Sequence, residues 1–435
     1  MATVNVPFTA MGTRYKASWT CSVTFFARLI LRLSTGCITL KVLHTRCSPA
    51  TISRSMTELL FRTSLENNGV SEITINFIER QMLSIRLEFT ALTEMTSPSA
   101  FYNTENSSKC HPKTQGAILD QLKNWILGNV EPNTSILWLA GLPGSGKSCI
   151  ARSIAEWCKQ QQLLLASFFF LRTDPSRNST KHFISSLAYT ITRTVPDSRP
   201  YIEQAIRSDP HVFSGTIDIQ MDSLVVDPLY HQYGSESSDP GIKPLTLEGS
   251  TPPKFNNHLP HVFVIDGLDE CGRSEEQRDI IRLFAATLKK NLGWKILITS
   301  RTDPTIQASF DRFVPSGLST HTTLSNSNAD IRWFLEDAFA ERKGRHAWSY
   351  SIPADWPSRA DIDKLVSRSF GLFIYAATVI KYVFSSDFDN PVDRLQSILD
   401  HDVRRCDVSH SSSPDLNIAV YVNILQTSGN PGFWL

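Results

Sequence analysis

The residues Gly141-Leu142-Pro143-Gly144-Ser145-Gly146-Lys147-Ser148 constrain the fold of this chain more than any other segment. They match the pattern G-x-x-x-x-G-K-[ST], and they lie between an apolar run at 136–140 and a segment at 148–161 whose apolar residues recur at helical spacing. The pattern alone would occur by chance in roughly one or two of every hundred chains of this length. Its position between a buried strand and an amphipathic helix favours a phosphate-binding loop over a plain glycine-rich turn.

A loop of this kind has a defined chemistry. Its glycines allow successive backbone N–H groups to point at a β-phosphate, and the helix that follows adds the positive end of its dipole. Lys147 would reach the β- and γ-phosphates, and the Ser148 hydroxyl would bind magnesium. We therefore expect residues 141–148 to bind ATP or GTP together with Mg²⁺.

A second buried strand, predicted at 261–265, ends in the acid Asp266. We expect this strand to neighbour the one that enters the loop, and Asp266 to bind Mg²⁺ through water. Asp269 and Glu270 follow, and either one could orient or deprotonate an attacking water; the sequence does not choose between them. The alternative is that these two acids cap the helix predicted over 274–291.

An arginine stands at the end of the next predicted strand, 295–299, in the sequence Thr299-Ser300-Arg301. There its guanidinium could contact the γ-phosphate and neutralise charge that develops in the transition state. The alternative is a surface ion pair. Asp269, Glu270 and Arg301 are thus the candidate catalytic residues.

Strands that alternate with helices predict an α/β fold, a P-loop NTPase with a mostly parallel sheet flanked by helices. After residue 327 the predicted strands stop, and helical spacing at 329–343, 359–368, 373–384 and 392–399 indicates a small all-α subdomain. The expected divisions are a leader and linker at 1–109, a nucleotide-binding domain at 110–327 with a variable loop at about 208–260, the helical subdomain at 328–400 and a truncated tail at 401–435.

The first 57 residues contain no acid but several arginines and lysines, a composition typical of organelle transit peptides. We expect a poorly ordered leader, with mitochondrial import as the alternative. The apolar stretch 24–43 is interrupted by Arg28, Arg32 and Lys41, which argues against a membrane span.

The whole chain carries a formal net charge of only +1, so its charge gives no reason to expect nucleic acid as a partner. Its eight cysteines include no C-x-x-C pair, which fits a reducing compartment such as the cytoplasm.

Three segments together resemble a NACHT domain: residues 140–148, 264–271 and 297–301. More narrowly, they are similar to fungal NACHT proteins whose nucleotide domain is labelled nephrocystin-3-like N-terminal. Four further segments match that subgroup: 110–114 with 125–126, 166–170, 330–335 and 371–377. The resemblance implies a signal-transduction ATPase or GTPase of the STAND class, which changes state on nucleotide exchange, turns over slowly and self-associates or contacts a signalling partner.

The chain departs from that family at three places. Gln115 stands where the family usually has an arginine near the base and ribose, which leaves adenine and guanine open. Phe373 stands where many related switch ATPases have a proline. Residues 420–425 look like the start of a winged helix, and the sequence ends soon after, at residue 435.

These observations support a nucleotide-dependent switch with slow hydrolysis as the leading hypothesis. The alternative is a scaffold or decoy fragment that binds nucleotide only for stability and transmits no signal. A small-molecule kinase is a third hypothesis, but the sequence shows no acceptor site and no arginine-rich lid.

Overall fold

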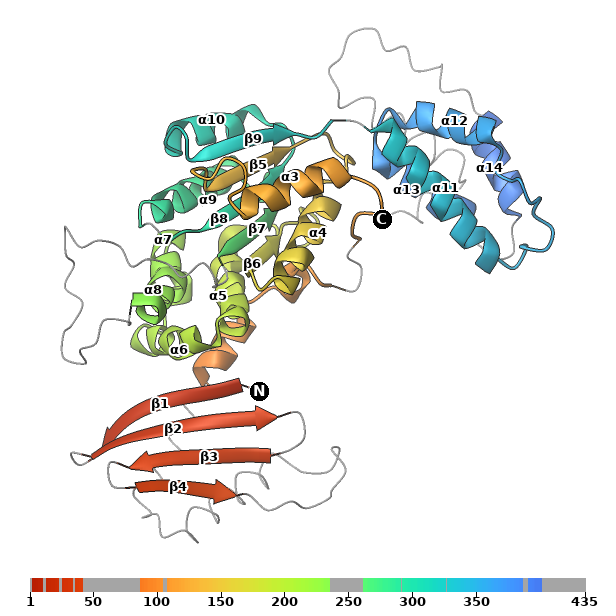
Figure 1. Cartoon of the computed structure of the whole chain (residues 1–435). Coiled ribbons are helices and arrows are strands. Elements are labelled where there is room, and N and C mark those ends of the chain that lie inside the picture. The colour runs from red at the N-terminus through yellow and green to blue at the C-terminus, as the bar shows by residue number, and fades with distance from the viewer. Residues whose placement is uncertain are drawn as a thin grey trace. The chain divides into compact units, whose positions relative to one another are not determined.

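The structure is a computed structural model (Figure 1). It describes residues 87–400 apart from 105–107, 235–260, 291, 326 and 386–389, and before them the backbone at 2–10, 13–22, 26–33 and 36–41. The chain divides into two compact units. One contains residues 1–97 and 181–256, and the other contains residues 98–180 and 257–435.

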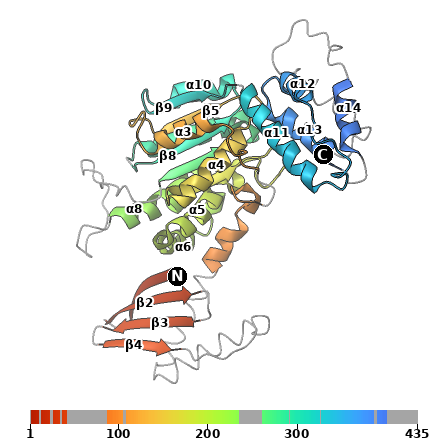
Figure 2. The same cartoon turned by 45° about the vertical axis from the view of Figure 1, so that its right-hand side comes forward.

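A parallel five-stranded sheet forms the centre of the second unit, with the strand order β6-β7-β8-β5-β9 (Figures 1 and 2). Its strands are β5 (Ile136–Ala140), β6 (Leu164–Phe169), β7 (Val262–Asp266), β8 (Lys295–Ser300) and β9 (Ser319–Thr323). Every residue of β5, β6 and β7 is buried, which explains their continuous apolar sequences. The predicted P-loop type of α/β fold is confirmed.

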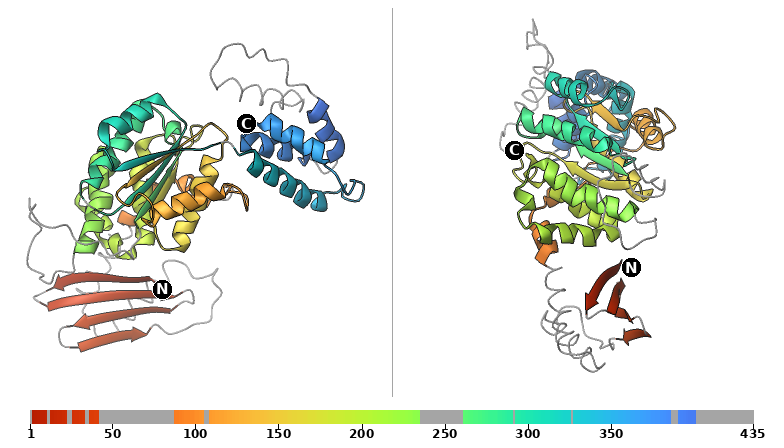
Figure 3. Two further views of the ribbon diagram at one scale, coloured as in Figure 1. Left: turned by 45° about the horizontal axis from the view of Figure 1, so that its top comes forward. Right: turned by 90° about the vertical axis from the view of Figure 1, so that its left-hand side faces the viewer.

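Helices cover both faces of this sheet (Figure 3). They are α3 (Gly116–Ile126), α4 (Lys147–Gln160), α9 (Ser274–Leu288) and α10 (Pro304–Phe313). Leu137 and Leu139 of β5 share a core with α3 and α4, whereas Trp138 between them stacks on Phe310 of α10. Successive side chains of a strand point to opposite faces, so α10 lies on the face opposite α4.

Strand β8 lies between the strand that enters the loop, β5, and the strand that ends in Asp266, β7. The expectation that these two strands are direct neighbours is therefore wrong. Strand β9 was not predicted. Its sequence Ser-Thr-His-Thr-Thr is polar because β9 is an edge strand that is only half buried.

The first unit contains a helix at 87–94 and the helices α5 (Phe183–Thr194), α6 (Arg199–Ser208), α7 (Ile217–Met221) and α8 (Asp227–Gly234). Residues 222–226 continue α7 with wider, π-type turns into α8. Within the variable region at about 208–260, the sequence predicts a short helix near 221–230 followed by an exposed loop, and the structure has residues 217–234 helical. Their apolar side chains, such as Leu224, Val225 and Leu229, are fully buried. Residues 235–260 lie outside the described residues.

The N-terminal residues belong to the same unit. The structure describes an antiparallel sheet of β1 (Ala2–Ala10), β2 (Thr13–Ser22), β3 (Phe26–Leu33) and β4 (Gly36–Lys41), paired in that order. The sequence shows a matching signal, because Val4, Val6 and Phe8 alternate with polar or small residues.

Four helices form the predicted all-α subdomain: α11 (Asn328–Arg345), α12 (Arg359–Ser369), α13 (Phe373–Val383) and α14 (Pro391–Asp400). They enclose a separate apolar core that includes Leu335, Leu365 and Val379, each fully buried. Ser358 and Asp361 form a reciprocal capping box at the start of α12. The predicted tail at 401–435 lies outside the described residues, and the domain boundaries stay predictions.

Among the residues that the structure describes, no helix combines the length and the apolar composition needed to cross a bilayer.

Candidate functional site

The glycine-rich loop leaves the carboxyl end of β5 and enters α4. Gly144 and Gly146 have φ angles of 76° and 98°, a left-handed conformation that glycine adopts without strain. Gly146 is also the N-cap of α4, and no side chain caps this helix. The first N–H groups of α4 thus have no side-chain acceptor, as an anion-binding helix terminus requires.

Lys147 folds back over the loop that precedes it. Its ammonium group donates hydrogen bonds to the carbonyl oxygens of Gly141 and Leu142, both at 2.8 Å. Burial lowers the pKa of Lys147 below its usual value, while the nearby carboxylates of Asp269 and Asp266 act in the opposite direction. A phosphate would supply the negative charge that this part-buried cation lacks at close range.

Ser145 provides an independent sign that the loop fits a polar ligand. Its side chain is 5% exposed, and its hydroxyl oxygen is buried without a hydrogen-bond partner in the described structure. Buried hydroxyl groups are normally paired. A phosphate oxygen is an acceptor of the right chemistry for this hydroxyl.

Asp266, Ser148 and Thr299 form a polar cluster beside the loop. The Thr299 hydroxyl donates to Asp266 Oδ1 at 2.5 Å and accepts from the Gly267 N–H at 3.1 Å. Ser148 is also hydrogen-bonded to Asp266, and burial raises the pKa of this carboxyl. A hydroxyl and a carboxylate in contact are suitable ligands for Mg²⁺ and its waters, and the cation would offset the buried negative charge.

Asp269 and Arg301 form a two-point pair. The Arg301 backbone N–H donates to Asp269 Oδ1 at 2.9 Å, and Arg301 Nε lies 3.1 Å from Oδ2. The carboxylate of Asp269 is almost buried, whereas the arginine side chain is about half exposed. Both oxygens of Asp269 therefore contact Arg301, and the ion pair joins two of the three candidate catalytic residues.

Glu270 has a different environment. Its Oε2 accepts a hydrogen bond from the Arg172 backbone N–H at 3.1 Å, and the Arg172 guanidinium donates to the Asp269 carbonyl at 2.9 Å. Burial raises the pKa of Glu270, and the neighbouring charges of Asp269 and Asp266 raise it further. A carboxyl with a raised pKa and one uncommitted oxygen suits proton transfer.

Sequence reasoning missed two residues of this group, Arg172 and Thr299. Arg172 follows β6, whose Phe169 is paired in register with Asp266. Carboxyl ends of parallel strands meet at one edge of a sheet, so charged residues directly after each apolar strand were the available signal. Thr299 was visible as a polar residue within an otherwise apolar strand, but its bridge between Asp266 and Gly267 depends on the strand order.

Part of the chain, including the candidate site, is similar to a known protein family. A profile of the family described as Nephrocystin 3, N-terminal, matches residues 117–238 and 230–301. The match includes the loop, Asp266, Asp269, Glu270 and Arg301. The chain has a P-loop NTPase fold. No curated protein matches it.

Solved structures give only loose overlaps. PCH-2 of C. elegans shares 11% identity with a TM-score of 0.34, over 65% of this chain and 66% of that chain. The Drosophila ORC bound to DNA shares 11% identity with a TM-score of 0.37, over 72% and 80%. A DNA replication initiation factor shares 9% identity with a TM-score of 0.32, over 76% and 98%. Overlaps at this level carry no argument about function.

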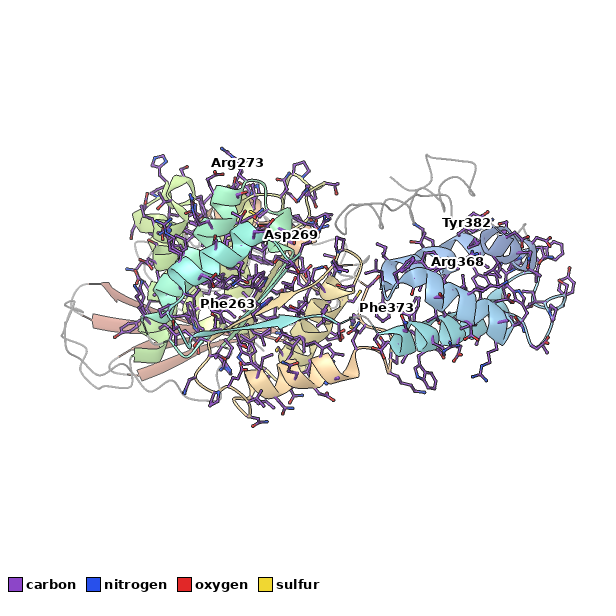
Figure 4. The ribbon with its side chains drawn as sticks, turned by 90° about the horizontal axis from the view of Figure 1, so that it is seen from above. Phe263, Asp269, Arg273, Arg368, Phe373 and Tyr382 are labelled. Carbon is purple, nitrogen blue, oxygen red and sulfur yellow. The ribbon has the colours of Figure 1, made fainter. Side chains whose placement is uncertain are left out.

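The helical subdomain reaches this P-loop directly. The Ile374 N–H, in the first turn of α13, donates to the Gly144 carbonyl at 3.1 Å. Asp330 of α11 accepts a hydrogen bond from the Gln115 N–H at 2.9 Å, just before α3. Figure 4 labels Phe373 at the start of α13, and its ring is 3.8 Å from the position of a Cβ built on Gly146.

Proposed function

We propose that this chain is a nucleotide-dependent switch of the NACHT, STAND type, which binds ATP or GTP with Mg²⁺ and hydrolyses it slowly. The observation that carries the proposal is the contact between α13 and the loop. The Gly144 carbonyl accepts from Ile374, and a Cβ built on Gly144 would lie 2.2 Å from Ile374 Cγ2. A rearrangement of the loop around phosphates cannot leave this contact unchanged.

The physical basis of such a switch is differential affinity. A nucleotide shifts a two-state equilibrium only if it binds the two states unequally. The helical subdomain lies against the loop at Gly144 and against the segment before α3 at Gln115, so its position is tied to two sides of the nucleotide site. Triphosphate and diphosphate would then favour different positions of α13.

The contacts support the following roles in hydrolysis. Ser148 and Asp266 would hold Mg²⁺, whose charge would stabilise the phosphates. Glu270 is the base that accepts a proton from the attacking water, because only one of its oxygens is engaged by Arg172. Arg301 neutralises charge on the γ-phosphate. Asp269 orients Arg301 instead of acting as the base, because both of its oxygens contact that arginine.

Nucleotide binding is tested first, with fluorescent ATP and GTP analogues and Mg²⁺ titrated against the full chain. Lys147→Ala is expected to weaken binding at least about tenfold, because the removed ammonium contacts the β- and γ-phosphates. Lys159→Ala is the matched control, an exposed lysine near the end of the same helix. Equal nucleotide affinity of the two variants would contradict the proposal that the loop binds nucleotide.

The switch is tested by hydrogen exchange of α13 in protein loaded with diphosphate or with a non-hydrolysable triphosphate. We expect exchange in the first turn of α13 to differ between the two states, with α14 as the internal reference. Particle size in the same two states tests self-association. Tight binding with identical exchange in both states would instead support the scaffold that uses nucleotide only for stability.

A further inference from the structure

Arg301 is anchored more firmly than its exposure suggests. Its side chain is 49% exposed. Its backbone, however, is held on both sides: the N–H donates to Asp269 Oδ1 at 2.9 Å, and the carbonyl accepts from the Ser300 hydroxyl at 2.8 Å. The direction in which this guanidinium leaves the sheet is therefore set by Asp269 and Ser300 together.

The Ser300 hydroxyl is itself fixed from the neighbouring strand. Ser300 is fully buried, and its oxygen accepts a hydrogen bond from the Trp138 indole N–H at 2.8 Å. Trp138 lies two residues before the end of β5 and is 1% exposed. Its ring stacks on Phe310 and on His321, with centroid separations of 5.0 and 4.3 Å, so the indole cannot easily turn away.

We propose that Trp138 and Ser300 are positioning residues for Arg301. The indole N–H orients the Ser300 hydroxyl, the hydroxyl holds the Arg301 carbonyl, and Arg301 thereby points at the γ-phosphate. The inference deepens the proposed function, since it rests on the role of Arg301 given there. It links the strand that enters the phosphate loop, β5, to the residue that distinguishes triphosphate from diphosphate.

A second tryptophan shows what a purely structural arrangement would look like. Trp125 is also 1% exposed, and its indole N–H also donates to a hydroxyl at 2.8 Å, that of Thr134. The Thr134 hydroxyl then donates to the Glu131 carbonyl, which closes a local turn. The difference that matters is what the hydroxyl does next, because the Ser300 hydroxyl holds the carbonyl of a candidate site residue, Arg301.

This pair supplies a matched experiment on the full chain. Trp138→Phe and Trp125→Phe each remove one buried indole donor and keep an aromatic ring. The measured quantity is the ratio of the Kd for the diphosphate to the Kd for a non-hydrolysable triphosphate, using ADP and ATPγS or the guanine pair, whichever the wild type prefers. Arg301→Ala defines the full effect, and thermal unfolding shows whether each variant is folded.

We expect Arg301→Ala to lower the ratio by about tenfold or more and Trp138→Phe to lower it by about fivefold, the effect of one neutral hydrogen bond. Trp125→Phe is expected to leave it unchanged. Ser300→Ala should lower the ratio as much as Trp138→Phe does. It replaces Trp138→Phe in the experiment if the tryptophan variant does not fold. In the Arg301→Ala background, Trp138→Phe should have no further effect.

Two outcomes overturn the inference and leave nucleotide binding at the loop intact. One is an unchanged ratio in Trp138→Phe while Arg301→Ala lowers it. The other is an equal drop in Trp138→Phe with and without Arg301. If Arg301→Ala itself leaves the ratio unchanged, the inference fails together with the proposed role of Arg301, and the separate Lys147→Ala titration still decides whether the loop binds nucleotide.

Discussion

The N–H of Ile374 donates a hydrogen bond to the carbonyl of Gly144, so the first turn of α13 lies directly on the phosphate-binding loop. Gly144 has φ of 76°, and a Cβ there would meet Ile374 Cγ2 at 2.2 Å and Cβ at 2.7 Å. Two separate constraints, backbone conformation and close approach, therefore require glycine at this position. The second exists only because the helical subdomain packs against the loop.

Gly144→Ala tests the importance of this contact. The added methyl group forces α13 or the loop to move, so nucleotide affinity is expected to fall by roughly tenfold. Gly128→Ala is the control, because Gly128 has φ of 74° but nothing within 4 Å of an added Cβ. It should lose about 1 kcal/mol of unfolding free energy with unchanged affinity. Fluorescent-nucleotide titration and denaturant unfolding measure both, and equal affinities would contradict the packing argument.

Asp266→Asn is expected to stabilise the nucleotide-free protein while it abolishes Mg²⁺-dependent binding. Burial raises the pKa of Asp266 above its usual 3.8, so the folded chain binds more protons at this site than the unfolded chain. The folded state therefore loses stability as the pH rises from about 3.8, the usual pKa, through the raised pKa of Asp266. Asparagine removes this buried charge, and we expect the free energy of unfolding to rise at neutral pH.

Thermal unfolding without nucleotide measures the effect of this substitution. Asp355→Asn, at an exposed aspartate, is the control that should change little. A lower melting temperature for Asp266→Asn than for the wild type would show that the Asp266 charge is favourable in the folded state.

The adjacent acids Asp269 and Glu270 are expected to differ in their effects. Glu270→Gln should reduce turnover about 100-fold or more and keep triphosphate affinity, as loss of a general base does. Asp269→Asn removes charge from the pair with Arg301. It should therefore lower both the turnover and the preference for triphosphate over diphosphate. Single-turnover hydrolysis and titration separate the two. If turnover is lost only in Asp269→Asn, Asp269 is the general base and Glu270 is not.

The pH dependence of turnover gives a further test of Glu270. Burial raises its pKa above the usual 4.5, and only the ionised carboxylate can accept a proton. Turnover is therefore expected to fall as pH is lowered through this raised pKa, on an acid limb above pH 4.5. In Glu270→Gln the residual rate should lack that limb. A wild-type profile that stays flat down to pH 4.5 would contradict the assignment.

Two aspartates of α11 contact the same short segment before α3, and they should contribute unequally. Asp330 accepts from the buried Gln115 N–H at 2.9 Å, whereas Asp337 pairs with His111 at 2.8 Å with its side chain 64% exposed. Asp330→Ala leaves a buried donor unpaired and should cost about 1–3 kcal/mol. Asp337→Ala should cost less than about 1 kcal/mol. Denaturant unfolding compares the two, and equal losses would contradict this ranking.

The alternating apolar segments and the glycine-rich loop were readable locally, because a buried parallel strand is apolar throughout and a helix repeats its apolar face. The same reasoning selected Lys147, Ser148, Asp266, Asp269, Glu270 and Arg301 as candidate site residues. It missed β9. The edge strand is polar because it is half exposed, so it has no clear periodic pattern.

The sequence by itself determined which residues are candidates for the chemistry, because the strand, loop and helix that present them are encoded by neighbouring residues. Only the tertiary structure decided their partners. The order β7-β8-β5 puts Thr299 on Asp266 and Arg301 on Asp269, and it brings Trp138 to Ser300, although 162 residues separate these two in the chain. Such pairings depend on strand order and on the packing of α13 against the loop, which no local sequence pattern encodes.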